Sequence, residues 1–179
     1  MNTARKSFPS IATLGLGGNI GDPPSAMAYA LTHIDRHLDC AIVSVSRLYQ
    51  TPPWGKTDQP DFFNCCAVIR TRLEPHALLD VCLAIERDMK RERIERWGPR
   101  AIDIDILTFD DRRSNDPQLV LPHPRMTERA FVLVPLADIA PHLEVDGLTI
   151  CDWLDQTDTG GITPASEDDT WWCSPPASP

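Results

Sequence analysis

The sequence has little positive charge. It contains 17 lysine and arginine residues against 26 aspartate and glutamate residues, so the formal net charge is −9. A general nucleic-acid-binding protein needs a positive surface to bind the phosphate backbone. The charge therefore argues against such a protein.

Long apolar segments are also missing. No apolar run approaches the roughly 20 residues that a membrane-spanning helix needs. The N-terminal stretch MNTARKSFPS has two basic residues, but no apolar region ending in a signal-peptide cleavage site follows it. We therefore expect neither a membrane span nor a secretory signal.

The six cysteines, at positions 40, 65, 66, 82, 151 and 173, form no C-x-x-C pair. Cys65 and Cys66 are adjacent and would point to opposite faces of a strand. This pattern is neither a disulfide framework nor a zinc site, and it predicts free thiols in a reducing cytoplasm. His33 and His37 have a helical metal-binding spacing, but no H-E-x-x-H motif surrounds them, so we interpret this stretch as an amphipathic helix.

The common nucleotide-binding motifs are absent too. Gly55-Lys56-Thr57 ends like a P-loop, but Gln50 stands at the position of the first glycine, and prolines remove backbone donors from the loop. The stretch GLGGNIG has Ile20 where a dinucleotide loop needs its third glycine. No H-R-D or D-F-G kinase signature occurs.

The patterns that are present predict a single α+β domain over residues 1–155. The expected order is β-α-β-β-α-β with short C-terminal additions, which is the ferredoxin-like arrangement of an antiparallel sheet with helices on one face. The composition of residues 156–179 predicts a disordered tail, although Trp171 and Trp172 could dock on another part of the protein. Strands are expected at 11–17, 41–50, 62–73, 101–107 and 118–122, helices at 23–38, 75–91 and 129–139, and a short element at 148–154.

Two helices carry clear sequence signals. Asp22 can cap the first helix, with Pro23 in its first turn, and Pro75 can open the second. The second helix has an apolar stripe at helical spacing, formed by Leu78, Cys82, Ile85 and Met89.

Residues 101–107 alternate strictly between isoleucine and another residue. Period two places Ile102, Ile104 and Ile106 on one face, and Asp103 and Asp105 on the other. Aspartate is unfavourable in strands, and the two charges, roughly 7 Å apart, repel each other. Two magnesium ions bound to these carboxylates and to substrate phosphates would remove that repulsion. The alternative, a solvated strand face with two charges, stays open on spacing alone.

A basic run precedes this strand. Arginine matches phosphate oxygens with its two-pronged guanidinium, and Trp97-Gly98-Pro99 could form a hinge or lid. Arginines and metals beside carboxylates are typical of phosphoryl transfer, although such a run is more often a solvated face. Its basic members are Arg87, Lys90, Arg91, Arg93, Arg96 and Arg100.

The loop TPPWGKTDQPDFFN has a different character. Its prolines stiffen the backbone, Phe62 offers a flat apolar surface, and Asn64 has both a donor and an acceptor. Such a loop could bind the edge of a flat heterocycle. A surface loop with Phe62 in the core is an equally good interpretation.

Taken together, four blocks resemble the 6-hydroxymethyl-7,8-dihydropterin pyrophosphokinases of folate biosynthesis, over about residues 11–155. The blocks are YQTPPWGKTDQPDFFN, the helix with Glu86, RWGPRAIDIDIL and LPHPRMTERAFVLVPLADIAP. The resemblance implies a monomeric ferredoxin-like enzyme. It implies transfer of the pyrophosphoryl group of ATP to the pterin hydroxymethyl, with release of AMP and with two Mg²⁺ ions.

The resemblance also implies residue roles. Asp103 and Asp105 match the metal ligands. ATP binding is implied for Glu86, Arg91, Arg100, His123 and Arg129. Catalytic roles are implied for Arg91, Arg93, Trp97 and Arg100. Pterin binding is implied for Thr51, Pro52, Trp54, Phe62, Asn64 and Phe131.

Two other functions fit parts of the sequence. A magnesium-dependent nucleotide hydrolase would explain the aspartates and arginines, but not the proline-rich loop with Phe62, Asn64 and Phe131. An RNA-recognition module shares the β-α-β-β-α-β order, but it needs paired sheet aromatics and a basic surface.

Overall fold

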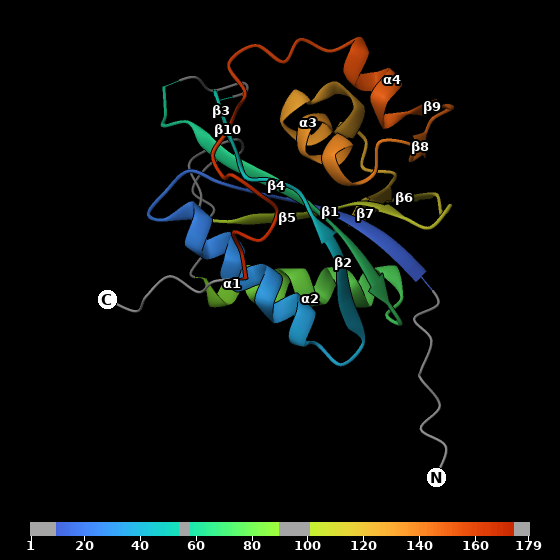
Figure 1. The fold of residues 1–179 in the computed structure, drawn as a ribbon. Helices are drawn as coiled ribbons and strands as arrows, with labels where there is room; N and C mark the ends of the chain where they lie inside the picture. The colour runs from blue at the N-terminus through green and yellow to red at the C-terminus, as the bar shows by residue number, and fades with distance from the viewer. Residues whose placement is uncertain (1–9, 54–57, 90–100, 174–179) are drawn as a thin grey trace.

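An antiparallel sheet forms the centre of the molecule (Figure 1). The computed structural model describes residues 10–53, 58–89 and 101–173. In the described chain the strands run in the order β10-β3-β4-β1-β5, and β2 pairs with the far part of β4. The arrangement of β5, β1, β4 and β2 confirms the ferredoxin-like fold. The strands are β1 (Ser10–Gly18), β2 (Cys40–Val45), β3 (Tyr49–Thr51), β4 (Phe62–Thr71), β5 (Asp103–Phe109) and β10 (Thr163–Pro164).

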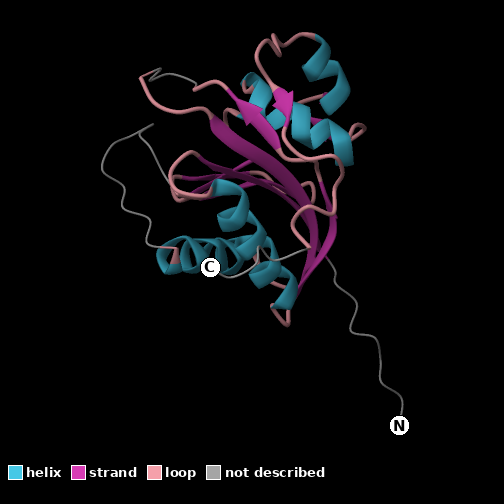
Figure 2. Ribbon diagram, turned by 60° about the vertical axis from the view of Figure 1, so that its left-hand side comes forward, coloured by secondary structure: helices cyan, strands magenta, loops and turns pink. Residues whose placement is uncertain are grey.

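Helices cover both faces of this sheet (Figures 1 and 2). Helices α1 (Pro23–Arg36) and α2 (Pro75–Asp88) pack on one face, and α3 (Ala130–Ile139) and α4 (Ile150–Asp155) lie over the other. The expectation of helices on one face only is therefore wrong. The second face of the sheet also carries apolar residues, among them Cys66 and Leu107. Helix α3 covers this face because those residues must be buried.

The first core lies between the sheet and α1 and α2. Leu14 and Leu16 of β1 and Ile104 and Ile106 of β5 belong to it, as period two predicts. Ile102, just before β5, is buried in it as well. The stripe of α2 is confirmed, since Leu78, Cys82 and Ile85 are buried and Met89 packs against the same core.

The start of α1 is as expected. The Asp22 side chain accepts a hydrogen bond from the Ser25 N–H at 3.2 Å, and Pro23 occupies the first turn. Such a cap satisfies one of the backbone donors that a helix leaves unpaired at its N-terminus.

The strand expected at 41–50 is split into β2 and β3. Ser46 lies at the break. Its N–H donates to the Cys66 carbonyl oxygen, and its Oγ accepts from the Cys66 N–H and donates to the Arg47 carbonyl oxygen. The serine hydroxyl thus takes the place of a backbone partner, which ends regular pairing. Period two does not reveal such an interruption.

Smaller elements follow β5. The expected strand at 118–122 is one arm of a hairpin, and the expected element at 148–154 is a two-residue strand leading into α4. The bounds are β6 (Ser114–Asp116), β7 (Leu119–Leu121), a 3-10 helix η1 (Met126–Glu128), β8 (Glu144–Val145) and β9 (Leu148–Thr149).

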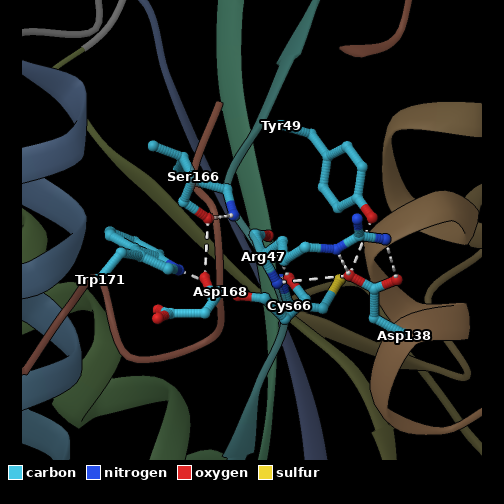
Figure 3. Close-up of polar contacts among 9 residues, drawn as sticks. Arg47, Tyr49, Cys66, Asp138, Ser166, Asp168 and Trp171 are labelled. Atoms are coloured by element: carbon cyan, nitrogen blue, oxygen red, sulfur yellow. Dashed lines mark hydrogen bonds and ion pairs between the residues drawn. The ribbon is translucent and has the colours of Figure 1, made fainter. Parts of the chain in front are cut away.

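Residues 156–173, hereafter the C-terminal strap, differ from the expected disordered tail. β10 pairs with β3, and the Trp171 indole N–H donates to the Ser46 carbonyl oxygen at 3.0 Å (Figure 3). Trp171 and Trp172 pack against the first core. The polar composition of this segment predicts disorder, but two tryptophans and a few backbone hydrogen bonds are enough to hold it against the fold.

The cysteines are free, as predicted, and Cys40, Cys65, Cys66 and Cys82 are buried. Over the ranges that the structure describes, no helix is both long and apolar enough to cross a membrane. His33 stacks on Tyr29 of the same helix with ring centroids 3.8 Å apart, in agreement with an ordinary helix surface.

Replacement of Leu31 by alanine should destabilise the protein. Leu31 of α1 is 0% exposed in the first core, so Leu31→Ala leaves a cavity that should lower the free energy of unfolding by about 2–5 kcal/mol. The matched control is Leu38→Ala, because Leu38 is 89% exposed and should change stability by less than about 0.5 kcal/mol. Urea unfolding of both variants checks this, and equal losses would contradict the described core.

Candidate active site

The candidate site lies on the face of the sheet that faces away from α1 and α2. Gly17 of β1 is opposite Asn64 of β4 on one side and opposite Asp103 of β5 on the other. Two residues earlier in β1, Gly15 is opposite Cys66 of β4 and Asp105 of β5 in the same way. A pocket opens over this grid. Its lining comprises Gly15, Leu16, Gly17, Asn64, Cys65, Cys66, Asp103, Asp105, Leu107, Arg129, Phe131 and Val132.

Glycine is required at the floor of this pocket. A Cβ atom on Gly17 would lie 2.6 Å from Oδ1 of Asn64, closer than any tolerable contact. Neighbouring strands are about 4.8 Å apart, so the gap at Gly17 separates the Asn64 and Asp103 backbones by about 10 Å. The glycines of LGLGG, residues 14–18, thus open the space between the asparagine and the carboxylates. Glycine inside a strand is the signal that could have revealed this, since it marks close approach of other groups.

Asp103 and Asp105 lie on the pocket face of β5, as the alternation predicts. Asp103 is 9% exposed, whereas the Asp105 side chain is 41% exposed. Their oxygen atoms suit Mg²⁺, which commonly binds one or two carboxylates and takes its other ligands from water and phosphates. In the described segments, no group of three or more histidine, cysteine, aspartate or glutamate side chains is arranged to hold a metal. Two carboxylates would fill only part of the coordination shell of such an ion, and water and phosphate oxygens would supply the rest.

Glu86 connects α2 to β5. Its carboxylate is 3% exposed, and Oε1 accepts a hydrogen bond from the Ile104 N–H at 2.7 Å. Ile104 lies between the two aspartates, so this bond fixes the backbone from which both carboxylates project. Sequence reasoning assigned Glu86 to ATP, and spacing along the chain did not indicate this contact.

His123 approaches the carboxylates from the loop after β7. Its backbone N–H donates to the Leu107 carbonyl oxygen at 2.8 Å. Its ring Nε2 lies 4.0 Å from Oδ2 of Asp105. Burial, together with the nearby positive charge of Arg129, lowers the pKa of His123 to about 4, so the ring is neutral at pH 7. Nδ1 accepts from the Arg125 N–H, which leaves the proton on Nε2, facing Asp105.

Asn64 is held by its neighbours. Its Nδ2 donates to Thr51 Oγ1 at 2.7 Å, and both side chains are buried. Asn19, just after β1, donates from Nδ2 to the Pro60 carbonyl oxygen and to Gln59 Oε1. These bonds place Asn64 at the pocket wall and tie the end of the loop before β4 to β1.

The other wall comes from α3. Arg129 lies directly before the helix, and its guanidinium carbon is 5.5 Å from the centroid of the Phe131 ring. Both residues line the pocket, whereas Phe62 is buried and lies outside the lining. The structure thus brings Asn64 and Phe131 to one cavity but does not place Phe62 in it.

Five predicted site residues lie outside the described residues. They are Trp54, Arg91, Arg93, Trp97 and Arg100. Pro52, in contrast, is described, and it is exposed directly after β3.

Comparison with known sequences identifies the family of this chain. The model of the family described as 7,8-dihydro-6-hydroxymethylpterin-pyrophosphokinase (HPPK) matches residues 13–141. The 2-amino-4-hydroxy-6-hydroxymethyldihydropteridine pyrophosphokinase of Methylorubrum extorquens is 50% identical over 151 residues, 84% of this chain and 96% of its own. The Bacillus subtilis protein of the same name is 39% identical over 153 residues, 86% of this chain and 89% of its own.

Solved structures agree in fold. The crystal structure of Plasmodium falciparum HPPK-DHPS, wild type with pteroate, superposes with a TM-score of 0.66 at 19% identity. The superposition covers 82% of this chain but only 44% of that longer one. The family model spans most of the chain, and the two bacterial relatives match it over nearly their whole length, so the chain belongs to the 7,8-dihydro-6-hydroxymethylpterin-pyrophosphokinase family.

Proposed function

We propose that this protein transfers the pyrophosphoryl group of ATP to the hydroxymethyl group of 6-hydroxymethyl-7,8-dihydropterin, with release of AMP, in folate biosynthesis. The observation that carries the proposal is the row Asn64–Gly17–Asp103. In this row the Asn64 amide and the Asp103 carboxylate lie on either side of a glycine, which supports assigning the amide to the heterocycle and the carboxylate to the phosphates. Family membership supports the same reaction.

The carboxylates form the phosphate end of the site. Asp103 and Asp105 would hold two Mg²⁺ ions together with the ATP phosphates, and bound Mg²⁺ would neutralise negative charge on the phosphate oxygens. The neutral His123 can donate from Nε2 to a phosphate oxygen beside Asp105. Arg129 adds a positive charge at the same cavity.

The asparagine forms the pterin end. With Nδ2 bonded to Thr51, Asn64 keeps its carbonyl oxygen and second N–H for the polar edge of the ring. Phe131 provides an apolar face at the opposite wall. Ring sandwiching between Phe62 and Phe131 would need Phe62 to turn toward the cavity. Pro52 and Trp54 of the adjoining loop complete the proposed pterin contacts.

The basic run would act on the transferred group. Arg91 and Arg100 are proposed to bind the triphosphate, and Arg93 and Trp97 to close over it. Glu86 would act through β5, because its carboxylate accepts a hydrogen bond from the Ile104 N–H. Positive charges held beside the transferred group would stabilise the negative charge that develops in the transition state.

The free thiols support a cytoplasmic location. A monomer is proposed because the site is assembled from strands and a helix of one chain. A nucleotide hydrolase remains the second candidate, because the two aspartates alone would serve it equally well.

The products of the reaction distinguish these two functions. Incubation with ATP, Mg²⁺ and 6-hydroxymethyl-7,8-dihydropterin should form AMP only when the pterin is present, as resolved by chromatography of the nucleotides. Formation of ADP, or loss of ATP without pterin, would contradict pyrophosphoryl transfer and favour the hydrolase.

Asp105→Ala should abolish turnover. Loss of a carboxylate that holds the charge-neutralising ions should lower kcat by about a thousandfold or more. Steady-state AMP formation over a range of Mg²⁺ concentrations measures this. Asp80→Ala is the matched control, because it removes an exposed carboxylate on α2, away from the pocket, and should keep full activity. Retained activity in Asp105→Ala would refute the assignment of Asp105 as a metal ligand.

Asn64→Ala should weaken pterin binding without changing ATP binding. The variant leaves the ring edge unsatisfied and frees Thr51, so the Kd for the pterin should rise about tenfold or more. Calorimetric titrations with each substrate test this separately. Asn115→Ala, at an exposed position of β6, is the control. An unchanged pterin Kd would remove Asn64 from the proposed site.

A further inference from the structure

The C-terminal strap, residues 156–173, lies outside the segment that the family model matches, which ends at residue 141. It crosses from α4 to the edge of the sheet and then toward α1 (Figure 1). Family membership therefore assigns it no role, while its contacts connect it to one part of the pocket.

The strap lies along the outer edge of β3. β10 pairs with β3 through Thr163 opposite Gln50 and Pro164 opposite Tyr49. The Ala165 N–H donates to the Leu48 carbonyl oxygen at 2.7 Å. A three-residue edge strand would otherwise present these backbone groups to water, so the strap gives β3 a second partner strand.

Side chains of the strap reinforce this pairing (Figure 3). Ser166 Oγ accepts from the Leu48 N–H at 2.9 Å and donates to the Asp168 carbonyl oxygen at 2.8 Å. Trp171 donates to the Ser46 carbonyl oxygen. The bonds to Leu48 and Ser46 hold the segment between β2 and β3, directly before β3.

β3 leads directly into the pterin end of the pocket. Its last residue, Thr51, holds Asn64, and Pro52 follows it. Gly161 of the strap packs so closely on Pro52 that a Cβ atom there would lie 3.2 Å from Pro52 Cγ. The strap thus contacts the strand from Leu48 to Pro52, on the side opposite β4.

β3 also has an anchor that does not involve the strap. Asp138 of α3 accepts hydrogen bonds from the Tyr49 hydroxyl at 2.8 Å and from the Arg47 guanidinium (Figure 3). Burial and the Asp138 carboxylate raise the pKa of Tyr49 to about 12, so the hydroxyl keeps its proton at neutral pH. β3 would therefore stay attached to the fold when the strap contacts are weakened, although its position would be less restricted.

We infer that the C-terminal strap is a positioning element for pterin binding: it holds β3 so that Thr51, at the end of β3, keeps Asn64 in the binding geometry. This inference rests on the proposed function, because it assigns the pterin to the Asn64 end. ATP binding is not expected to depend on the strap, since Asp103, Asp105 and His123 lie on β5 and the loop after β7.

Full-length Ser166→Ala/Trp171→Phe tests the inference. The double variant removes three hydrogen bonds, two of which join the strap to Ser46 and Leu48, and it keeps an aromatic ring at position 171. If the correctly held state falls to about a tenth of the molecules, the apparent Kd for the pterin rises about tenfold. The Kd for ATP, and kcat at saturating pterin, should stay within about twofold of the unmodified chain, because the removed bonds are to Ser46, Leu48 and Asp168, none of which belongs to the proposed phosphate end. Calorimetry and steady-state kinetics measure these quantities.

Two control variants accompany the double variant. Glu167→Ala changes an exposed residue of the same strap that takes no part in the contacts above, and it should leave both Kd values unchanged. Ser166→Thr/Trp171→Phe restores the hydroxyl and should recover part of the pterin affinity.

The possible outcomes distinguish a failure of the proposed function from a failure of the positioning role of the strap. An unmodified chain that binds no pterin would overturn the proposed function and this inference with it. An unmodified chain that binds pterin, with an equal pterin Kd in the double variant, would overturn the inference alone. A parallel loss of ATP and pterin affinity with a lower Tm would also overturn it, because that result shows general stabilisation instead of positioning.

Discussion

Close packing at Gly17, near the C-terminal end of β1, is the constraint on which the site depends. Between Asn64 and Asp103 the chain has only Gly17, and no side chain fits there because Asn64 Oδ1 occupies the space. The strand spacing then determines the width of the gap. The two ends of the proposed site are held at a defined separation by backbone hydrogen bonds, which are stiffer than any pair of flexible side chains.

The carboxylates illustrate how the two faces of the sheet cooperate. Asp103 and Asp105 need a strand that presents them to a pocket, while Ile104 between them and Ile106 after them need a core. Glu86 serves both needs from the helical face, because its buried carboxylate bonds the backbone of Ile104. On the pocket face, His123 is bonded through its backbone to Leu107 of the same strand and reaches Asp105 with its ring. β5 is therefore fixed along its length before any ligand binds, which lowers the cost of arranging charges around phosphates.

The proposed pterin end is held by a different set of contacts. β3 is short, and its position depends on partners that are distant in the sequence: β4 on one edge, the C-terminal strap on the other, and Asp138 of α3. α3 also carries Phe131 and buries the apolar residues of the pocket face. The walls of the cavity are thus connected to each other through Asp138, Tyr49 and Arg47, as well as through the sheet.

Local patterns in the sequence determined much of this protein. Period two placed Asp103 and Asp105 on one face, Asp22 and Pro23 marked the start of α1, and helical spacing gave the buried stripe of α2. These features follow from interactions between residues a few positions apart, so the sequence alone reveals them. Tertiary structure decided the pairing of Gly17 with Asn64 and Asp103, the bond from Ile104 to Glu86, the break at Ser46, the placement of α3 on the second face and the path of the strap. Each of these depends on register or contact between segments far apart in the chain, and no local periodicity specifies which distant partner a strand or a buried polar group will meet.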